Sequence, residues 1–441
     1  MSRTRRSKPP STELISFDDA AALVAERAAK ITRVRPGVEH MRLDAALGRV
    51  LAAPLRADAD QPAFPRSTRD GFACRANELS KYIELAVVGS TRAGQIPTGS
   101  LPRGAAWEIM TGAPVPAGAD AVVMLEHVEE NGSGSARMIR LQAGRSITRG
   151  ENVVPRGAQA SKGEMLLDAG ALITAAQIAL AASCGAVALD VFRKPRVAIL
   201  STGDELVPIG AKPGPSQIRN SSSAMLAAMV TASGGGPWVL PIARDTAKSL
   251  DAAIARASAA DMLLITGGVS AGKFDLVEPA LARAGARFQF TGVRIQPGKP
   301  IVFAEFPRGR SEDISQDEND AESHQKGGAK CFCFGLPGNP VSSYVTFLLF
   351  AAPTLAALAG RSDIGSRFAL ARLTAPVKTK TGLTRFLPAT CTFAGPSPEV
   401  TLVPWQGSGD LAAMARANCF LVVPEDAEHL AAGSTVRILL S

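Results

Sequence analysis

The sequence predicts an α/β protein with additional β-rich domains, and three observations lead to that class. From Pro195 onward, short apolar strands alternate with helices, the pattern of a parallel sheet whose strands are joined by right-handed crossovers. Residues 60–149, and the residues after Arg361, show short strands and turns instead. The chain has 441 residues, too many for one hydrophobic core, so roughly three or four domains are expected.

The N-terminal part is expected to contain a disordered tail and two helices. Residues 1–12 form a polar tail that carries the basic residues Arg3, Arg5, Arg6 and Lys8. Ser16 is expected to cap a helix that begins at Phe17, because a short hydroxyl side chain satisfies the first free backbone N–H groups. A second helix is expected over Arg42–Leu51.

A β-rich domain is expected to interrupt this helical region. The segment Pro62–Arg66 breaks the helical periodicity, and helical character returns near Thr174. We therefore predict a split helical N-terminal domain that consists of residues 13–59 and 150–192. The β-rich domain inserted into it consists of residues 60–149.

The rest of the chain is predicted to form a central α/β domain over residues 193–361 and a small C-terminal β-barrel-like domain over residues 362–441. The expected strands are Val197–Leu200, Trp238–Ile242 and Met262–Thr266, and the expected helices are Ser222–Ala232, Ala247–Ala259 and Val277–Ala284. The polar run of residues 307–330 is expected to be a disordered surface insertion.

Composition argues against nucleic-acid and membrane partners. The net charge of +8 suits an anionic ligand, but the basic residues are mixed with acidic ones and no aromatic platform accompanies them. Two apolar segments, Ala169–Leu189 and Phe347–Ala359, are expected to be buried helices: polar residues interrupt the first, and the second is short and contains Pro353. Because no apolar secretory segment is seen near the N-terminus, we expect a cytoplasmic protein.

The cysteines and histidines do not form a recognisable site. The six cysteines include no C-x-x-C motif, and none of the four histidines stands at a metal-ligand spacing from a cysteine. The alternation of a strand puts Cys331 and Cys333 on one face. A structural zinc site and a Cys–His nucleophile are therefore not expected.

A glycine-rich loop is the first candidate site. The segment Leu264–Gly272 is a short apolar strand that runs into a loop with three glycines, and Asp275 lies just beyond it. Glycine brings no Cβ into the way, so backbone N–H groups can approach an anion closely at the carboxyl end of a parallel strand. Such loops are also common as ordinary turns.

Three carboxylates are expected at the same edge of the sheet. Glu205 follows the first strand of the α/β domain, Asp245 follows the second, and Asp275 follows the third. Like charges that converge need a cation between them, and hard oxygen ligands suit Mg²⁺. Taken one at a time, each carboxylate is more simply explained as an exposed loop residue or a helix N-cap.

Further short segments complete the pattern: Leu47–Leu51, Ser201–Leu206, Gly298-Lys299-Pro300 and Gly335–Ser342. Together these motifs resemble those of the molybdopterin molybdenumtransferase (MoeA-type) family, whose eukaryotic relatives include the E domain of gephyrin. The resemblance extends from about Ser16 to Ile438.

The resemblance implies an activity and its residues. It implies insertion of molybdate into adenylylated molybdopterin with Mg²⁺-assisted release of AMP. The catalytic residues that it implies are Asp70, Thr111, Glu205, Asp245, Asp275 and Lys299, of which Glu205, Asp245 and Asp275 would bind the metal. The residues that it implies for binding the pterin and molybdate are Thr266, Gly267, Gly268, Ser270, Gly272, Pro337, Asn339, Pro340 and Ser342.

The resemblance also implies an assembly and partners. The expected assembly is an elongated homodimer, with each site between the α/β domain of one subunit and the β-rich insert of the other. Molybdopterin adenylyltransferase would be the upstream donor, and molybdoenzyme apoproteins or cofactor-maturation proteins would lie downstream. A tungstate-preferring paralogue and a non-catalytic pterin-binding scaffold are the alternatives. The retained carboxylates and Lys299 favour catalysis, since a scaffold needs no acidic cluster opposite a phosphate loop.

Several positions depart from the family pattern. The family usually has methionine, tyrosine, aspartate and lysine, respectively, at Arg69, Phe72, Asn152 and Gln296. In the last domain, Leu383 and Pro388 stand where the usual pattern has arginines. We hypothesise that Arg69 or Arg385 compensates for Gln296 and Leu383 by attracting the molybdate dianion. The alternative is that both arginines are simply solvated.

Overall fold

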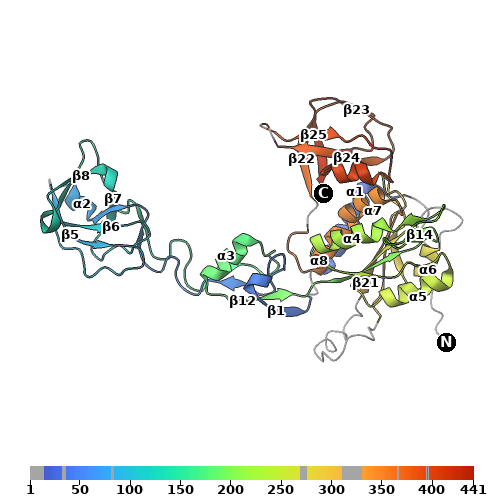
Figure 1. Ribbon diagram of the computed structural model, residues 1–441, viewed down its shortest axis with the longest axis horizontal. Coiled ribbons are helices and arrows are strands. Elements are labelled where there is room, and N and C mark those ends of the chain that lie inside the picture. The colour runs from blue at the N-terminus through green and yellow to red at the C-terminus, as the bar shows by residue number, and fades with distance from the viewer. Residues whose placement is uncertain are drawn as a thin grey trace.

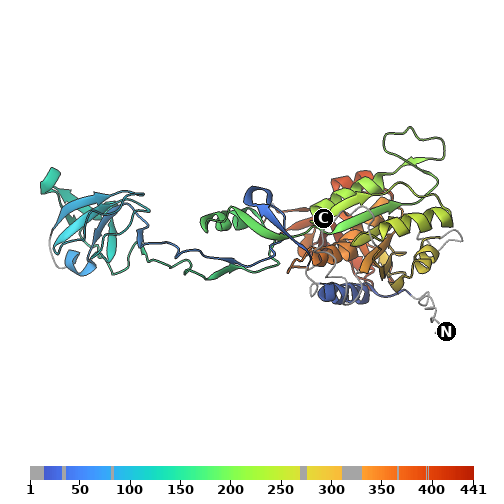
Figure 2. The same cartoon turned by 90° about the horizontal axis from the view of Figure 1, so that it is seen from below.

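The structure, a computed structural model, describes residues 14–31, 36–80, 84–268, 276–309, 330–364, 367–393, 395 and 397–441. It is elongated, with a large body at one end, a small module in the middle and a β-rich insert at the other end (Figures 1 and 2). The predicted tail and most of the predicted surface insertion, residues 1–12 and 310–329, lie outside the described residues.

The body contains a six-stranded sheet that confirms the predicted α/β class. Its order is β16 (Gly236–Val239), β13 (Arg196–Ser201), β17 (Met262–Thr266), β21 (Lys330–Leu336), β20 (Val302–Pro307) and β18 (Arg287–Phe290). The first four strands are parallel, whereas β20 and β18 are antiparallel. The helices of this part are α4 (Ser221–Ala232), α5 (Ala247–Ala257), α6 (Val277–Arg283), α7 (Pro340–Thr346) and α8 (Ala352–Leu358). The predicted helices thus form where the apolar periodicity indicated.

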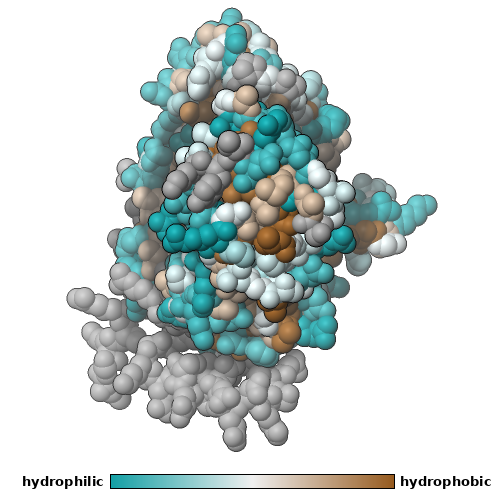
Figure 3. Space-filling view, turned by 90° about the vertical axis from the view of Figure 1, so that its left-hand side faces the viewer, coloured by the Kyte–Doolittle hydropathy of each residue, from teal (hydrophilic) through white to brown (hydrophobic). Residues whose placement is uncertain are grey.

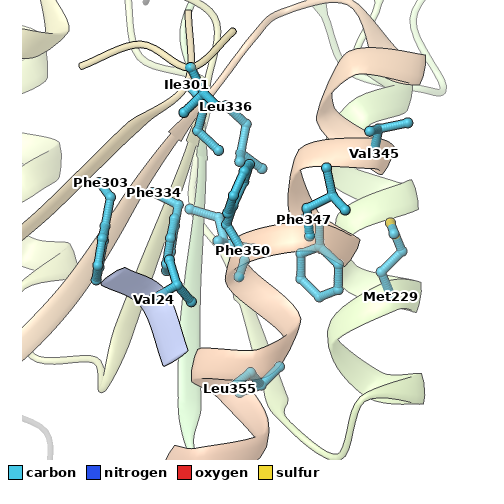
Figure 4. Close-up of a cluster of buried hydrophobic side chains, with 14 of the residues drawn as sticks. Val24, Met229, Ile301, Phe303, Phe334, Leu336, Val345, Phe347, Phe350 and Leu355 are labelled. Atoms are coloured by element: carbon cyan, nitrogen blue, oxygen red, sulfur yellow. The ribbon is translucent and has the colours of Figure 1, made fainter. Parts of the chain in front are cut away.

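Each face of this sheet is covered by its own hydrophobic core. Phe303 and Phe334 stack with ring centroids 4.6 Å apart on the face that α4, α7 and α8 cover (Figure 4). Cys331 and Cys333 point to the other face, where α5 and α6 pack, as strand alternation predicted. All six cysteines are buried and free. Burial raises the pKa of Cys74 to about 12, so that thiol stays protonated at neutral pH.

The first helix, α1 (Phe17–Ile31), begins where Ser16 predicted, and the Ser16 hydroxyl accepts a hydrogen bond from the backbone N–H of Asp19 at 3.0 Å. It packs against α8 and the core of the body. Its buried side chains, Phe17, Ala20, Val24 and Ala28, recur every three or four residues, the spacing of a helix with one apolar face. The body therefore includes a helix that the sequence assigned to the split helical domain.

A long helical stretch crosses the body. The helix α7, a π-helical turn over Phe347–Ala351 and α8 together span Pro340–Leu358. Of the described residues, this is the one stretch long and apolar enough to cross a membrane, but 72% of its apolar window is buried within the protein. It is therefore the core helix that the sequence predicted around Phe347–Ala359.

The middle module is formed by residues 36–57 and 163–192. Its elements are β1 (Val38–Arg42), a 3₁₀ helix η1 (Leu43–Ala45), β2 (Leu55–Arg56), β11 (Met165–Leu167), α3 (Ala175–Ser183) and β12 (Ala188–Phe192). The helix predicted over Arg42–Leu51 is wrong: Arg42 ends a strand paired with β12, and Gly48 adopts a φ of 74° that stops any helix. Pairing with a distant strand outweighs local propensity here.

The buried helix predicted over Ala169–Leu189 is also largely wrong. Only α3 is helical within it, and Ala181 is the one buried residue of that helix. Thr174 and Gln177 form the capping box that starts α3, which fits the predicted return of helical character near Thr174.

The insert, residues 66–154, is β-rich as predicted. Its sheet has the order β7 (Ala121–Met124), β4 (Gly71–Cys74), β6 (Ala105–Ile109), β5 (Leu85–Thr91), β9 (Met138–Leu141) and β8 (Val128–Asn131). The short helices α2 (Ala76–Leu79), η2 (Leu125–His127) and η3 (Gly134–Ala136) connect these strands, and β3 (Arg66–Ser67) pairs with β10 (Val153–Val154) at the base. Seen from this end, the surface is mixed, with small hydrophobic patches among hydrophilic residues (Figure 3).

The C-terminal part closes into a five-stranded barrel, as predicted. The barrel strands are β24 (Thr384–Thr392), β25 (Glu399–Leu402), β22 (Phe368–Leu373), β28 (Thr435–Leu440) and β26 (Cys419–Val423), and β26 pairs back with β24. The remaining short elements are β14 (Leu206–Val207), β15 (Ile218–Arg219), β19 (Ile295–Gln296), β23 (Val377–Lys378), α9 (Leu411–Arg416) and β27 (His429–Leu430). The strand β19 joins the barrel to the body by pairing with β24.

Candidate active site

The glycine loop lies at the carboxyl end of β17, where the sequence predicted it. Gly267 and Gly268 have φ values of 94° and 62°, a conformation that L side chains rarely adopt. A Cβ on Gly267 would lie 2.3 Å from the carbonyl oxygen of Thr202, so no larger residue fits. Residues 269–275, among them the predicted site residues Ser270, Gly272 and Asp275, lie outside the described residues.

A second predicted loop lies against this one. The buried Thr266 hydroxyl is 3.5 Å from the carbonyl oxygen of Pro337, which also accepts a hydrogen bond from the Ser343 hydroxyl. A Cβ on Gly338 would be 3.6 Å from the Cα of Gly267. The ends of β17 and β21 therefore bring the two glycine motifs together.

The start of α7 connects this edge to the barrel. Asn339 precedes Pro340, the first residue of α7, and its Nδ2 donates to the Ser408 hydroxyl at 2.9 Å. Ser342 is buried in the first turn. Ser408 was not among the predicted site residues, although its position between Gly407 and Gly409 indicates a close backbone approach.

A hydroxyl orients the predicted carboxylate Asp245. The Thr202 hydroxyl donates to Oδ1 of Asp245 at 2.6 Å, and the backbone N–H of Asp245 lies 3.4 Å from Oδ1 of Asp204. The carboxylate of Glu205 folds over Gly203, where a Cβ would lie 2.6 Å from Glu205 Oε2. Thr202 and Asp204 thus belong to the edge, although the sequence analysis did not select them.

The acidic edge does not by itself complete a metal site. Among the residues that the structure describes, no group of three His, Cys, Asp or Glu side chains could hold a metal ion. Asp275, the third metal ligand that the sequence predicted, falls in the segment beyond Gly268 that the structure does not describe. The metal set of Glu205, Asp245 and Asp275 stays a prediction.

Lys299 lies in a tight turn beside α7. The backbone N–H of Val293 donates to the Lys299 carbonyl at 3.0 Å, and that of Ile301 donates to the Gly298 carbonyl at 3.2 Å. A Cβ on Gly298 would lie 2.5 Å from Cγ2 of Thr346, so glycine allows the turn to pack on α7. The turn therefore presents an exposed Lys299 next to the helix that carries Ser342.

The remaining two predicted catalytic residues pair with each other in the insert. Oδ1 of Asp70 accepts hydrogen bonds from the backbone N–H of Thr111 at 2.6 Å and from its hydroxyl at 2.8 Å. These bonds, the backbone one first, hold the pKa of Asp70 below its usual value, so the exposed carboxylate stays ionised at neutral pH.

Asn152 supports the loop that carries Asp70. Its φ of 55° is the one positive value outside glycine in the described parts of the chain. Its carbonyl accepts from the backbone N–H of Thr68 at 3.0 Å, and its Nδ2 donates to the Val122 carbonyl at 2.9 Å. An aspartate could not make that donation, so the departure from the family pattern has a local structural basis.

The predicted site residues therefore form two groups at opposite ends of the molecule. Asp70 and Thr111 lie in the insert, and the glycine loops, Asp245 and Lys299 lie in the body, with the middle module between them (Figures 1 and 2). Within one chain, the structure does not bring the two groups together.

Two cavities lie elsewhere. One of about 750 Å³ lies between the start of α1 and the barrel, and one of about 210 Å³ lies between α8 and β28. None of the predicted site residues lines either cavity.

Three consecutive parts of the chain match families of one pathway. Residues 15–185 match the MoeA N-terminal region (domain I and II), residues 198–357 match the probable molybdopterin binding domain, and residues 370–441 match the MoeA C-terminal region (domain IV).

Curated relatives and solved structures agree with these matches. The chain is 34% identical to the molybdopterin molybdenumtransferase of a Nostoc species, over 80% of this chain and 76% of the relative, and 33% identical to that of Bacillus subtilis, over 91% and 89%. Two crystal structures of the molybdopterin biosynthesis MoeA protein from Pyrococcus horikoshii are similar over 97% of this chain. The first is 30% identical with a TM-score of 0.68 over 99% of its length, and the second is 25% identical with a TM-score of 0.74 over 100%. The chain therefore belongs to the molybdopterin molybdenumtransferase family, enzymes of molybdenum cofactor biosynthesis.

Proposed function

We propose that this protein inserts molybdate into adenylylated molybdopterin and releases AMP, with Mg²⁺ as the assisting ion. The observation that carries the proposal is the edge where Gly267 packs on Thr202 and Gly338. Thr202 in turn orients Asp245. A glycine surface for an anionic phosphate thus lies directly beside an acidic group that suits a cation.

The glycine loops are proposed to bind the phosphate end of the pterin substrate. Gly267 and Gly268 keep their backbone free of side chains. Asn339, Pro340 and Ser342 would contact the substrate from the start of α7. Lys299 would supply a positive charge from the neighbouring turn, because an ammonium group attracts phosphate and molybdate oxygens alike.

The donor set at the edge fits Mg²⁺. Carboxylate oxygens are the ligands that this ion prefers, and Glu205 and Asp245, with Asp275, are the residues that would hold it. When bound, the ion would offset negative charge on the phosphate oxygens of the anhydride. Thr202 would keep the carboxylate of Asp245 turned toward the ion, since its hydroxyl occupies one oxygen.

The working enzyme is proposed to be a homodimer with two composite sites. Asp70 and Thr111 belong to the insert, which the middle module separates from the body (Figure 1). A second copy related by a twofold axis would bring its insert to that edge, and the same contact would be made in reverse. Each site would then take Asp70 from one subunit and Asp245 from the other.

The chemistry of the substrate indicates which reactions would come before and after the proposed one. A reaction that adenylylates molybdopterin must supply the substrate, and the proposed donor is a molybdopterin adenylyltransferase. Molybdoenzyme apoproteins or cofactor-maturation proteins would take up the product. We propose that the reaction occurs in the cytoplasm.

The test is AMP release by the purified protein from adenylylated molybdopterin. We expect release that depends on both molybdate and Mg²⁺. The same assay with tungstate ranks the two oxyanions, and a preference for tungstate would redirect the proposal to that substrate. A protein that binds the pterin but releases no AMP with either oxyanion would be a non-catalytic pterin-binding scaffold, and the proposal would fail.

A further inference from the structure

The joint between the body and the barrel fixes an arginine that has only neutral partners. Nε of Arg385 donates to Oε1 of Gln296 at 2.9 Å, and Nη1 donates to the Leu383 carbonyl at 3.1 Å and to the Lys380 carbonyl. The parallel pairing of β19 with β24 sets Gln296 opposite Arg385, so the contact follows from the strand register. In the described parts of the chain, Arg385 has no carboxylate partner.

These three acceptors hold the guanidinium group without neutralising it. All of them are amide oxygens, so the full positive charge remains, and Nη2 donates to no described atom. The side chain is only half-buried, which leaves that charge accessible. A guanidinium that is already fixed loses little entropy when it binds an anion.

A second cation without a partner belongs to the same turn. Lys299 follows Gln296 by three residues, is exposed, and makes no ion pair with any residue that the structure describes. The turn is closed by the Val293–Lys299 backbone hydrogen bond and packs on Thr346 of α7. Arg385 thus lies opposite the start of the turn at Gln296, and Lys299 lies within the turn.

We propose that Arg385, positioned by Gln296, binds the tetrahedral oxyanion substrate and sets the affinity of this enzyme for it. This inference rests on the proposed function, because that function identifies molybdate as the oxyanion. The fork of a guanidinium can contact two oxygens of a tetrahedral dianion, and Lys299 adds a point charge from the turn. Arg69 lies exposed in the insert, and its contacts with the described residues are those of its backbone with the Ser67 hydroxyl.

The direct test measures molybdate binding to the full-length protein by calorimetry. Arg385→Ala is expected to weaken binding by about 10- to 100-fold, the range of a charge-assisted hydrogen bond. Arg372→Ala, which removes an exposed arginine from another barrel strand, is the matched control and should leave binding unchanged. Thermal unfolding of each variant checks that the fold is kept.

A second pair of variants tests the role of Gln296. Gln296→Leu removes the acceptor of Nε and should weaken molybdate binding less than Arg385→Ala does, because the charge remains but is no longer fixed. In the Arg385→Ala protein, adding Gln296→Lys should restore most of the binding by returning a cation to the turn. Failure of this rescue would contradict a role based on charge at this position.

Activity measurements separate molybdate from the phosphate of the pterin. Arg385→Ala should raise the molybdate concentration for half-maximal AMP release and leave that for the pterin substrate unchanged. A change only in the pterin value would assign Arg385 to the phosphate, and unchanged molybdate binding would overturn the inference outright. If the wild-type protein binds molybdate through Arg385 but releases no AMP, the proposed function fails while the oxyanion contact stands.

Discussion

In the insert and in the body, a threonine orients an aspartate, but the two aspartates differ in the hydrogen bonds that hold them. In the insert, Thr111 holds Asp70 through its backbone N–H as well as its hydroxyl. In the body, the hydroxyl of Thr202 is the one group among the described residues that donates to the carboxylate of Asp245. A backbone donor remains when the side chain is changed, so we expect the insert to tolerate the loss of its hydroxyl better than the body does. The comparison shows which half of the proposed site depends on one side-chain atom.

The largest expected effect tests whether Asp70 and Asp245 of one site come from two different subunits. Asp70→Ala and Asp245→Ala homodimers should each lose nearly all AMP release, since every site lacks one carboxylate; a lost metal ligand costs more than the 10- to 100-fold of an outer contact. Co-expression of the two variants at equal levels makes about half of the dimers mixed, and each mixed dimer has one intact site. About a quarter of wild-type AMP release should therefore return.

The control for this experiment is Asp251→Ala, which removes an exposed carboxylate of α5 paired with Arg283, and which should stay active in every combination. Mixed dimers must be confirmed by purification through two different tags. If confirmed mixed dimers remain inactive, Asp70 and Asp245 do not act across the subunit boundary.

Loss of the single hydroxyl in the body should have the next largest effect. Thr202→Val keeps the shape of the buried side chain and removes only the donor to Asp245. We expect AMP release to fall about 10- to 100-fold, the usual cost of losing a group that orients a metal ligand. Steady-state kinetics at several Mg²⁺ concentrations measure this, and Thr202→Ser, which keeps the hydroxyl, should stay near wild type. Equal activity of the valine and serine variants would remove Thr202 from the mechanism.

The equivalent change in the insert should have the smallest effect. Thr111→Val removes one hydrogen bond to Asp70 and leaves the backbone one, which is the larger cause of the lowered pKa. Because hydrogen bonds to a carboxylate favour its ionised form, losing one should raise the pKa of Asp70 toward its ordinary value of 3.8. The carboxylate stays ionised at neutral pH in both proteins, so AMP release there should change less than in Thr202→Val.

A carbon-detected NMR titration of the Asp70 carboxyl measures this pKa directly. A downward shift in Thr111→Val would contradict the assigned cause. A loss of neutral-pH activity as large as that of Thr202→Val would mean that the Thr111 hydroxyl contacts the substrate.

Periodicity and strand ends predicted the parts of the fold that local sequence controls. The helix α4 and the strand β17 form where the sequence predicted a helix near Ser222–Ala232 and a strand over Met262–Thr266. The helix expected over Arg42–Leu51 failed because β1 pairs with β12, some 150 residues away along the chain. The pairing of two strands so far apart cannot be predicted from the local sequence pattern.

The residues of the candidate site also fall into those that local sequence could predict and those that it could not. Gly267 and Asp245 could be found because both follow apolar strands that must end at one edge. Thr202 and Ser408 could not, because their roles depend on hydrogen bonds to residues far away along the chain. The role of Asp275 stays a prediction.

Because β3 pairs with β10 at the base of the insert, the insert should be removable from the rest of the chain. Ser67 lies opposite Val153, so the chain enters and leaves the insert at adjacent points. Segments whose two ends lie close together can be exchanged or removed with little disturbance to the polypeptide on either side. A short glycine-serine linker from Arg66 to Val154 should therefore yield a folded body with its middle module. For the same reason, the excised insert should be transferable to a different host protein.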